Sequence, residues 1–345
     1  MEIINHNTGT DHERVLSCRD EANGYHGIIA IHSTRLGPAL GGARFWNYAS
    51  QEDALFDVLR LSRGMTYKNA LAGLPFGGGK SIIIGDNRTT RRAELFRAHG
   101  RFVETLGGSY ITAEDVGTST TDMEYVLTVT QHVAGLANRS GDPSPVTARG
   151  VFRAMQAAAR HRWGADEIAG RKVALQGCGH VGYYLAKELH EAGAKLIVTD
   201  VDRARFERVV GECGAESVEP EEIYGVKADI FAPCALGGIL NDRTLPQLKV
   251  EIVAGAANNQ LLDARHGEAL AARDILYAPD YAANAGGVIN GCIELLGWEQ
   301  AESRTKVEAI YDTLLEIFQL AETDGIPTYK AADQLAEARL QQTDA

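Results

Sequence analysis

The sequence predicts an α/β fold in two domains, the second built on a doubly wound parallel sheet. The chain has 345 residues, about twice the size of a common domain, so two cores are expected. Short apolar runs alternate with amphipathic stretches along the chain, which is the pattern of α/β proteins. Between residues 138 and 145 the string NRSGDPSP gathers residues that break both helices and strands, and it predicts the domain boundary.

The first domain is predicted over residues 1–138. Its apolar runs HGIIAIH and KSIIIGD are predicted strands. The stretches QEDALFDVLRLSRGM and RRAELFRAHGRFVETLG have the apolar spacing of helices that cover a core with one face. These elements predict a separate α/β core for this part of the chain.

The second domain is predicted over residues 139–327. It opens with the helix TARGVFRAMQAAARHR, and RKVALQGCGHVGYYLAKELHEAGAKLIVTD then has the strand, turn, helix and strand of a βαβ unit. Buried parallel strands are expected at ADIFAPC, EIVAGA and ILYAPD. Two helices, SRTKVEAIYDTLLEIFQLAETDG and KAADQLAEARLQQ, are expected on either side of GIPT. We expect the last helix, over residues 328–345, to pack back on the first domain.

Composition excludes several classes of partner. The net charge of -12 disfavours nucleic acids and anionic membranes, because both require clustered Lys and Arg. The five cysteines form no C-x-x-C pair, so neither a disulfide framework nor a metal site is expected, and a reducing cytoplasm fits best. No signal peptide or membrane-spanning run is expected either.

A G-x-G-x-x-G pattern, formed by Gly177, Gly179 and Gly182, follows the strand KVALQ and opens a helix. In this context the first glycine permits a tight turn, the second lets the backbone approach a pyrophosphate, and the third lets the helix pack on the strand. Free N–H groups at the helix N-terminus then bind the phosphates. The sequence therefore predicts a Rossmann-like dinucleotide site, which also includes Cys178, His180 and Val181. The alternative is a glycine turn in a domain that has lost its nucleotide.

Asp200 ends the next strand, eighteen residues after Gly182, and Val201 follows it. An acidic side chain at this position accepts hydrogen bonds from the adenine ribose and repels a 2′-phosphate, so NAD is expected as the cofactor. Arg203 and Arg205 weaken the preference for NAD over NADP.

The segment GMTYKNALAGLPFGGGKSIIIGD contains Lys68 and Lys80, the second directly after three glycines. A phosphate-binding loop of the Walker type requires a glycine six residues before its lysine, where this chain has Leu74. The Walker interpretation therefore fails. Taken alone, both lysines would be interpreted as solvated surface charges.

Seven segments, in order over almost the whole chain, resemble the leucine, valine and phenylalanine dehydrogenases of the glutamate dehydrogenase superfamily, and the leucine enzymes most of all. They are LGPALGGARFW, GMTYKNALAGLPFGGGK, ITAEDVGT, QGCGHVG, FAPCALGGIL, AGAANNQL and PDYAANAGGVIN. The resemblance implies an N-terminal α/β substrate domain and a C-terminal Rossmann-like NAD-binding domain with a cleft between them. It also implies a homo-oligomer, at least a dimer, that acts on an L-amino acid, a 2-oxo acid and ammonia.

By this resemblance Lys80 is the catalytic lysine, Lys68 pairs with the substrate α-carboxylate, and Asp115 exchanges protons with the amino group. Taken alone, Asp115 could equally cap a helix or a turn. In the family, hydride leaves Cα, water attacks the iminium ion, and the carbinolamine releases ammonia. A lysine with the ordinary pKa of about 10.4 can activate water only when it is desolvated or close to another cation, which Lys68 could provide. Deamination is therefore expected to rise toward alkaline pH.

The resemblance also implies a set of further contacts. For the cofactor these are Cys234, Ala235 and Asn259, and for the substrate they are Leu40, Gly41, Gly42, Met65, Ala113, Asn284, Val288 and Gly291. Leu40 stands where the glutamate enzymes carry a lysine that pairs with the side-chain carboxylate. Because leucine cannot pair with a carboxylate, glutamate should be rejected and an apolar side chain accepted.

Gly291 stands where the leucine enzymes carry a valine. The missing side chain deepens the pocket unless a neighbour fills the space. Branched-chain amino acids are the first expectation, and phenylalanine or another aromatic amino acid is the alternative. A non-catalytic NAD-binding sensor is the alternative from another class, but it would need none of Lys68, Lys80 and Asp115. A 2-hydroxy-acid dehydrogenase usually requires a His and Arg pair, and none stands out.

Overall fold

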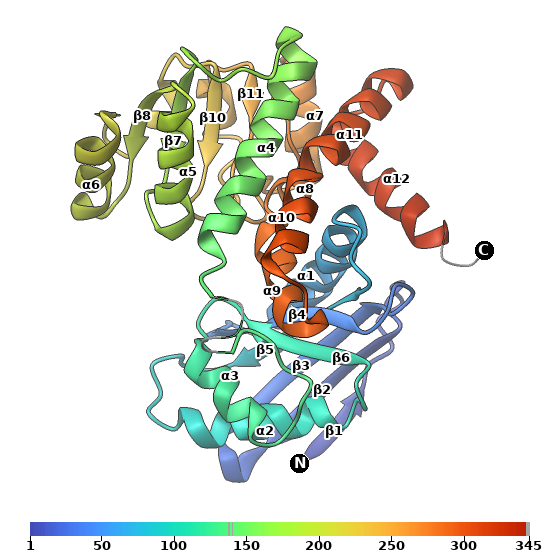
Figure 1. Ribbon diagram of the computed structural model, residues 1–345. Coiled ribbons are helices and arrows are strands. Elements are labelled where there is room, and N and C mark those ends of the chain that lie inside the picture. The colour runs from blue at the N-terminus through green and yellow to red at the C-terminus, as the bar shows by residue number, and fades with distance from the viewer. Residues whose placement is uncertain (137–138, 140, 343–345) are drawn as a thin grey trace. The chain divides into compact units, whose positions relative to one another are not determined.

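The computed structural model describes residues 1–136, 139 and 141–342 (Figure 1). The chain divides into two compact units. Unit 1 comprises Met1–Gly141, Gly291–Trp298 and Ala336–Ala345, and unit 2 comprises Asp142–Asn290 and Glu299–Leu335. Asn138, at the boundary predicted from the sequence, lies outside the described residues, and so do residues 343–345 of the predicted last helix.

Unit 1 is built on a mixed sheet of six strands in the order β1-β2-β3-β5-β4-β6. The pairs β1–β2, β2–β3 and β3–β5 are antiparallel, whereas the pairs β5–β4 and β4–β6 are parallel. The strands are β1 (Glu2–Asn5), β2 (Arg14–Asp20), β3 (Tyr25–Ser33), β4 (Ala39–Trp46), β5 (Gly77–Ile84) and β6 (Tyr110–Glu114).

Both faces of this sheet are covered, which explains the uninterrupted apolar run over residues 28–31 in the predicted strand HGIIAIH. Ile28 and Ala30 of β3 pack with residues of α1, whereas Ile29 and Ile31 pack with residues of α2. Successive side chains of a strand point to opposite faces, so a strand between two helical layers buries every residue. The helical segments of this unit are η1 (Glu21–Asn23), α1 (Gln51–Leu71), α2 (Arg92–Glu104) and α3 (Thr120–Leu127).

Helix α1 is longer than its amphipathic pattern predicts. It begins at the cap Ser50, whose side chain accepts a hydrogen bond from the N–H of Asp53, and it continues six residues past the predicted end at Met65. Tertiary contacts hold this last part, because the buried Asn69 donates from Nδ2 to the carbonyl oxygen of Gly77 at 2.6 Å. Lys68 therefore lies on the helix rather than in a loop.

Unit 2 is built on a parallel sheet of six strands in the order β12-β11-β10-β7-β8-β9, as the doubly wound prediction requires. Strands β7, β8 and β9 follow one another along one half of the sheet. The next strand in the sequence, β10, pairs with the other side of β7, and β11 and β12 continue that half. The strands are β7 (Lys172–Gln176), β8 (Lys195–Thr199), β9 (Glu216–Ser217), β10 (Ile230–Pro233), β11 (Ile252–Val253) and β12 (Leu276–Tyr277). The carboxyl ends of β7 and β10 thus form the switch point at which such sheets bind ligands.

The core of unit 2 consists of aliphatic and aromatic side chains from these strands and from the segments packed against them, including Phe231, Val253 and Leu270. The sequence predicts one helix over residues 303–325, whereas the structure has two, α10 and α11, which meet at Ala309. The α-helices are α4 (Ser144–Trp163), α5 (His180–Glu191), α6 (Arg203–Cys213), α7 (Ala264–Ala272), α8 (Asp280–Ala283), α10 (Gln300–Glu308) and α11 (Ile310–Asp324). The short 3-10 helices are η2 (Ile223–Gly225) and η3 (Leu245–Gln247).

Two helices contribute residues to both units. Helix α9 (Gly286–Leu296) begins in unit 2 and ends in unit 1, and so does α12 (Thr328–Gln341). The end of α12 contacts α1, because Arg339 donates from Nη1 to the carbonyl oxygen of Leu71 at 2.6 Å. Over the described part of the chain, none of the helices combines the length and the apolar character that a membrane crossing requires.

Candidate active site

Lys80 and Asp115 form a mostly buried ion pair in unit 1. Lys80 lies in β5 and is 6% exposed, and its Nζ is 3.2 Å from Oδ2 of Asp115, which directly follows β6. Lys80 alternates with Gly78 and Ile82 along the strand, so it shares the face that packs against α1. A Cβ built on Gly78 would lie 2.0 Å from the backbone nitrogen of Thr66, so only glycine lets α1 lie this close to β5.

Arg44 is a member of this cluster that the sequence interpretation missed. Its Nε donates to Oδ2 of Asp115 at 3.1 Å, and its Nη1 donates to Oδ2 of Asp57 at 2.9 Å. The hydroxyl of Tyr48 donates to the same Asp57 oxygen at 2.5 Å. The register between β4 and β6 brings Arg44 to Asp115, because Ala43 pairs with Glu114. Two cations and two carboxylates therefore alternate in one connected network.

The electrostatics of the cluster keep Asp115 ionised. Burial raises the pKa of this carboxyl, but the charges of Lys80 and Arg44 outweigh burial, so its pKa lies below the ordinary value. For Arg44, burial lowers the pKa, but the carboxylates of Asp115 and Asp57 raise it further, and the net shift is upward. Asp115 is therefore an anion held between two basic side chains.

Two glycines of β4 bring the strand close to its neighbours. A Cβ on Gly41 would lie 1.8 Å from the carbonyl oxygen of Gly79 and 3.3 Å from Cγ of Met65. A Cβ on Gly42 would lie 2.3 Å from the carbonyl oxygen of Glu114 and 2.8 Å from Cβ of Asp115. No other residue type fits either position, so the glycines allow Asp115 to lie against β4.

The remaining substrate residues predicted in this unit lie on the same elements. Leu40 is 4% exposed and pairs with Gly78 on one side and Ile111 on the other. Ala113 in β6 pairs with Gly42 and is half-buried. Lys68 is half-buried in the last turn of α1. The ion-pair network starts at Asp57 and connects through Arg44 and Asp115 to Lys80.

The glycine-rich turn of unit 2 lies at the switch point of the sheet. Gly177 has φ of 95°, and a Cβ there would meet Ala235 and Cys234 at 2.9 Å. A Cβ on Gly182 would lie 1.9 Å from the carbonyl oxygen of Gly177 and 3.5 Å from Cβ of Cys234. The turn after β7 is therefore packed tightly against the start of α5 and against the residues that follow β10.

Gly179 differs from these two glycines because its surroundings are open. A Cβ built on it would meet a single described atom within 4 Å, Nη1 of Arg205 at 4.0 Å, neighbouring residues apart. Gly179 is also the N-cap residue of α5, and it has no side chain that could accept a hydrogen bond from the first N–H groups of the helix. An open glycine before uncapped N–H groups leaves room for a pyrophosphate, so this turn fits a dinucleotide.

Asp200 lies at the end of β8, beside the turn. Its Oδ2 accepts a hydrogen bond from the N–H of Cys178 at 2.7 Å, and its Oδ1 accepts one from the N–H of Asp202 at 2.8 Å. Val201 is 92% exposed, and Leu236, which was not predicted, is 82% exposed. Exposed apolar side chains after two strands at this edge provide a surface suited to an adenine ring.

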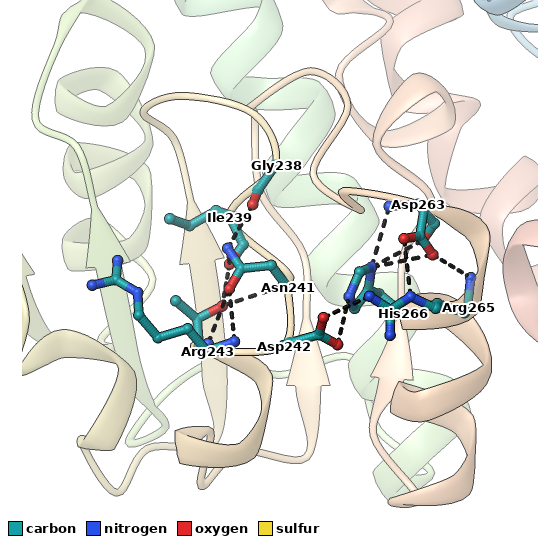
Figure 2. Close-up of polar contacts among 9 residues, drawn as sticks. Gly238, Ile239, Asn241, Asp242, Arg243, Asp263, Arg265 and His266 are labelled. Atoms are coloured by element: carbon teal, nitrogen blue, oxygen red, sulfur yellow. Dashed lines mark hydrogen bonds and ion pairs between the residues drawn. The ribbon is translucent and has the colours of Figure 1, made fainter.

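Side-chain hydrogen bonds fix the loops after β10 and β11. Asn241 donates from Nδ2 to the carbonyl oxygen of Gly238 at 2.8 Å, and its Oδ1 accepts from the N–H groups of Arg243 and Thr244 (Figure 2). The N–H of Gly238 donates to the carbonyl oxygen of Asn259 at 2.7 Å. Asn259 itself has φ of 51°, a left-handed conformation that asparagine tolerates.

His266 connects the two loops from the start of α7. Its ring is 2% exposed, its Nε2 lies 3.2 Å from Oδ1 of Asp242, and its Nδ1 accepts from the N–H of Asp263 at 3.2 Å (Figure 2). Arg265 forms ion pairs with the same two aspartates. These contacts hold the segments that carry Cys234, Ala235 and Asn259 in fixed positions.

The three residues predicted near the end of the chain lie in α9 or just before it. Asn284 donates from Nδ2 to the carbonyl oxygen of Ala256 at 3.0 Å and to Oδ1 of Asn258 at 2.8 Å, whereas its buried Oδ1 has no partner among the described residues. Val288 and Gly291 are half-buried. A Cβ built on Gly291 would meet no described atom within 4 Å beyond its neighbours and its own helix backbone.

Comparison with known proteins decides the family. Residues 12–132 match the Glu/Leu/Phe/Val dehydrogenase dimerisation domain, and residues 140–204 and 198–344 match the Glutamate/Leucine/Phenylalanine/Valine dehydrogenase domain. The chain belongs to the Glu/Leu/Phe/Val dehydrogenase family. It is therefore an amino-acid dehydrogenase of a family that uses NAD, and the α/β fold with a Rossmann-like second part is confirmed.

Relatives with different substrates are similar to this dehydrogenase over nearly its full length. The leucine dehydrogenase of Geobacillus stearothermophilus is 53% identical over 344 residues, which cover 99% of this chain and 94% of that protein. The phenylalanine dehydrogenase of Caldalkalibacillus thermarum is 47% identical over 349 residues, with 99% and 94% covered. The crystal structure of L-tryptophan dehydrogenase from Nostoc punctiforme has a TM-score of 0.87 and 46% identity, and 97% of each chain is covered.

Proposed function

We propose that this dehydrogenase catalyses the reversible, NAD-dependent oxidative deamination of L-leucine, L-valine and L-isoleucine to the 2-oxo acid and ammonia. The buried network of Lys80, Asp115 and Arg44 carries the proposal, because a protein that only binds NAD needs no such cluster. The high identity to a leucine dehydrogenase supports the choice of branched-chain substrates.

The proposed roles follow from the chemistry of each side chain. The ammonium group of Lys68 would pair with the substrate α-carboxylate, and Lys80 would orient and deprotonate the attacking water. Asp115, ionised and 3.2 Å from Lys80, would accept a proton from the substrate amino group. Arg44 donates to Asp115, the proposed proton acceptor, so we assign it a positioning role. The bound cofactor supplies the hydride acceptor.

The residues of unit 2 fit the cofactor in three ways. The open backbone at Gly179 and the N–H groups at the start of α5 would hold the pyrophosphate. Asp200 would accept hydrogen bonds from the adenine ribose, which favours NAD over NADP. The unpartnered Oδ1 of Asn284 would accept a hydrogen bond from a ligand N–H group.

The side-chain specificity is proposed to depend on Leu40 in β4. Leu40 is 4% exposed and lies between Gly78 and Ile111, so the carboxylate of a glutamate side chain would gain no ionic partner there. Leaving a charge unpaired in a buried site costs several kcal/mol. Glutamate should therefore be rejected by a large factor.

An aromatic substrate is the second candidate, because of Gly291. The space around a Cβ at this position is open, and no described side chain fills it. The relatives of this chain also include an L-tryptophan dehydrogenase and a phenylalanine dehydrogenase.

Two further properties belong to the proposal. We propose a homo-oligomer, at least a dimer, since residues 12–132 match a dimerisation domain. We propose a cytoplasmic location, because a reducing compartment fits five scattered cysteines without a C-x-x-C pair.

The test is NADH formation at alkaline pH with leucine, valine, isoleucine, phenylalanine, tryptophan and glutamate as substrates. Lys80→Ala should abolish turnover on every substrate, whereas Lys195→Ala, at an exposed lysine of β8, should not change it. Highest turnover on a branched-chain substrate supports the first candidate, and highest turnover on an aromatic one supports the second. Tight NAD binding without turnover on any amino acid would overturn the proposal.

A further inference from the structure

Arg205 lies next to the glycine-rich turn although it comes from a different βα unit. It belongs to the first turn of α6, and its side chain is 57% exposed. Its Nη1 is 4.0 Å from the point that a Cβ on Gly179 would occupy. The guanidinium therefore lies in front of the backbone that a dinucleotide phosphate must approach.

The contacts of Arg205 leave a phosphate-binding edge available. Its Nε is 3.2 Å from Oδ2 of Asp202, the cap of α6, and this contact fixes the side chain near the turn. Within the described residues, its two terminal nitrogens make no other ion pair. A guanidinium held through Nε can still offer both terminal N–H groups to one phosphate.

Asp202 offsets part of the charge of Arg205, and an anion bound at the turn would interact with both the guanidinium and the start of α5. The N-terminus of α5 carries the positive end of the helix dipole, and Gly179 supplies no side-chain acceptor to its N–H groups. A cation placed beside such a terminus adds positive charge to positive charge. Asp200, beside the turn, accepts hydrogen bonds from the N–H groups of Cys178 and Asp202 through its two oxygens.

We propose that Arg205 binds a phosphate of the dinucleotide at this turn. This inference rests on the proposed use of NAD. The pyrophosphate is the expected partner, because Gly179 is the position where it approaches the backbone. The 2′-phosphate of NADP is the other possible source of the same chemistry, and the experiment separates the two.

Arg203 is the matched control, since it is an arginine in the same turn of α6. Its Nε is 2.7 Å from Oε1 of Glu207 one helical turn away, and its side chain is 83% exposed. No contact of Arg203 with the glycine-rich turn is found among the described residues. Both arginines can be replaced without exposing a core residue, so neither variant should fail to fold.

The experiment measures the dissociation constants of NADH and NADPH directly, by calorimetry, for the native enzyme and for Arg205→Ala, Arg205→Lys and Arg203→Ala. Arg205→Ala should weaken NADH binding by about tenfold, as the loss of a charge-assisted hydrogen bond predicts. Arg205→Lys should recover part of this loss, and Arg203→Ala should stay within about twofold of the native enzyme. The difference should shrink between 0.05 M and 0.5 M salt, because added ions screen an exposed contact.

The two dinucleotides distinguish the phosphates. An equal loss for NADH and NADPH in Arg205→Ala assigns the contact to the pyrophosphate, and a loss confined to NADPH assigns it to the 2′-phosphate. If Arg205→Ala binds both as the native enzyme does, the inference is wrong while the proposed function stands. If the native enzyme binds neither, the proposed function and this inference both fail.

Discussion

The Nζ of Lys80 lies 3.2 Å from Oδ2 of Asp115, and the same carboxylate oxygen accepts a hydrogen bond from Nε of Arg44 at 3.1 Å. One carboxylate thus connects two basic side chains from neighbouring strands. Burial of all three groups makes each of them sensitive to the loss of another.

Replacing Asp115 with asparagine should remove the proton acceptor while keeping the shape of the side chain. We expect kcat for deamination to fall by at least about a hundredfold, the usual contribution of a general base. NADH binding, measured by calorimetry, should not change. The control is Asp324→Asn at the exposed end of α11. An Asp115→Asn enzyme with nearly native turnover would show that this carboxylate takes no part in the chemistry.

Replacing Arg44 with lysine keeps the positive charge. The single nitrogen of a lysine side chain cannot replace the two nitrogens with which Arg44 contacts Asp115 and Asp57. We expect kcat to fall by about tenfold and the pH profile of kcat to shift, while KM changes little. Steady-state rates between pH 7 and pH 11 test this, with Arg60→Lys on the exposed face of α1 as the control. An unchanged pH profile would limit Arg44 to a structural role.

Replacing Gly291 with valine should fill the open space at this position. We expect the ratio of kcat/KM for leucine to kcat/KM for phenylalanine to rise by about tenfold, because added methyl groups exclude a ring. Gly211→Val is the matched control, since Gly211 also lies within a helix and a Cβ there likewise meets nothing within 4 Å. Equal ratios in the two variants would mean that Gly291 does not line the substrate site.

Replacing Gly182 with alanine places a methyl group 1.9 Å from the carbonyl oxygen of Gly177, unless the backbone shifts. The turn must then open, so NADH binding should weaken by more than about tenfold. Calorimetry measures this loss, and thermal unfolding shows whether the domain remains folded. Gly211→Ala adds the same group in open space and serves as control. If Gly182→Ala bound NADH with native affinity, the glycine pattern would not be part of the cofactor site.

His99 should make the protein less stable in acid. Its ring is fully buried, with Nδ1 2.9 Å from the hydroxyl of Tyr25, and burial lowers the pKa of this histidine to about 3. In the unfolded chain the pKa is about 6.5, so between these pH values the unfolded state binds the extra proton. The free energy of unfolding should therefore fall as pH drops through this window, by up to about 1.4 kcal/mol per pH unit.

The measurement for His99 is urea unfolding at pH 7, 6, 5 and 4. His99→Gln should unfold more easily at pH 7 but lose less stability on acidification than the native protein. The control variant is His132→Gln, at a partly exposed histidine of the same unit. His12 and His32, whose pKa values burial also lowers, should keep part of the slope in every variant. A slope unaffected by His99→Gln would contradict the assignment.

The sequence predicted the parts of the fold that depend on local pattern. Apolar periodicity found β3, β5 and the βαβ unit around Gly177, because burial on one or both faces leaves a pattern in adjacent residues. It missed the last six residues of α1, which are held by a contact between Asn69 and the backbone of Gly77. Such a contact leaves no trace in helical periodicity.

The candidate site shows the same division. Lys80 and Asp115 were identified by family resemblance, whereas no local pattern distinguishes Arg44 from a surface arginine. Arg44 and Asp115 are 71 positions apart in the chain, and only the parallel register of β4 and β6 brings them together. Knowing that register would have identified Arg44 in advance.

When Lys80 is protonated, the formal charges of the Lys80, Arg44, Asp115 and Asp57 network sum to zero. An amino acid enters as a zwitterion, itself neutral, so its arrival leaves this balance intact. A substrate with an additional ionised side chain would disturb it, which is an electrostatic reason for selectivity independent of pocket shape. The same balance means that any single neutralising substitution leaves one uncompensated charge, and only paired replacements such as Arg44→Met with Asp57→Leu preserve electroneutrality.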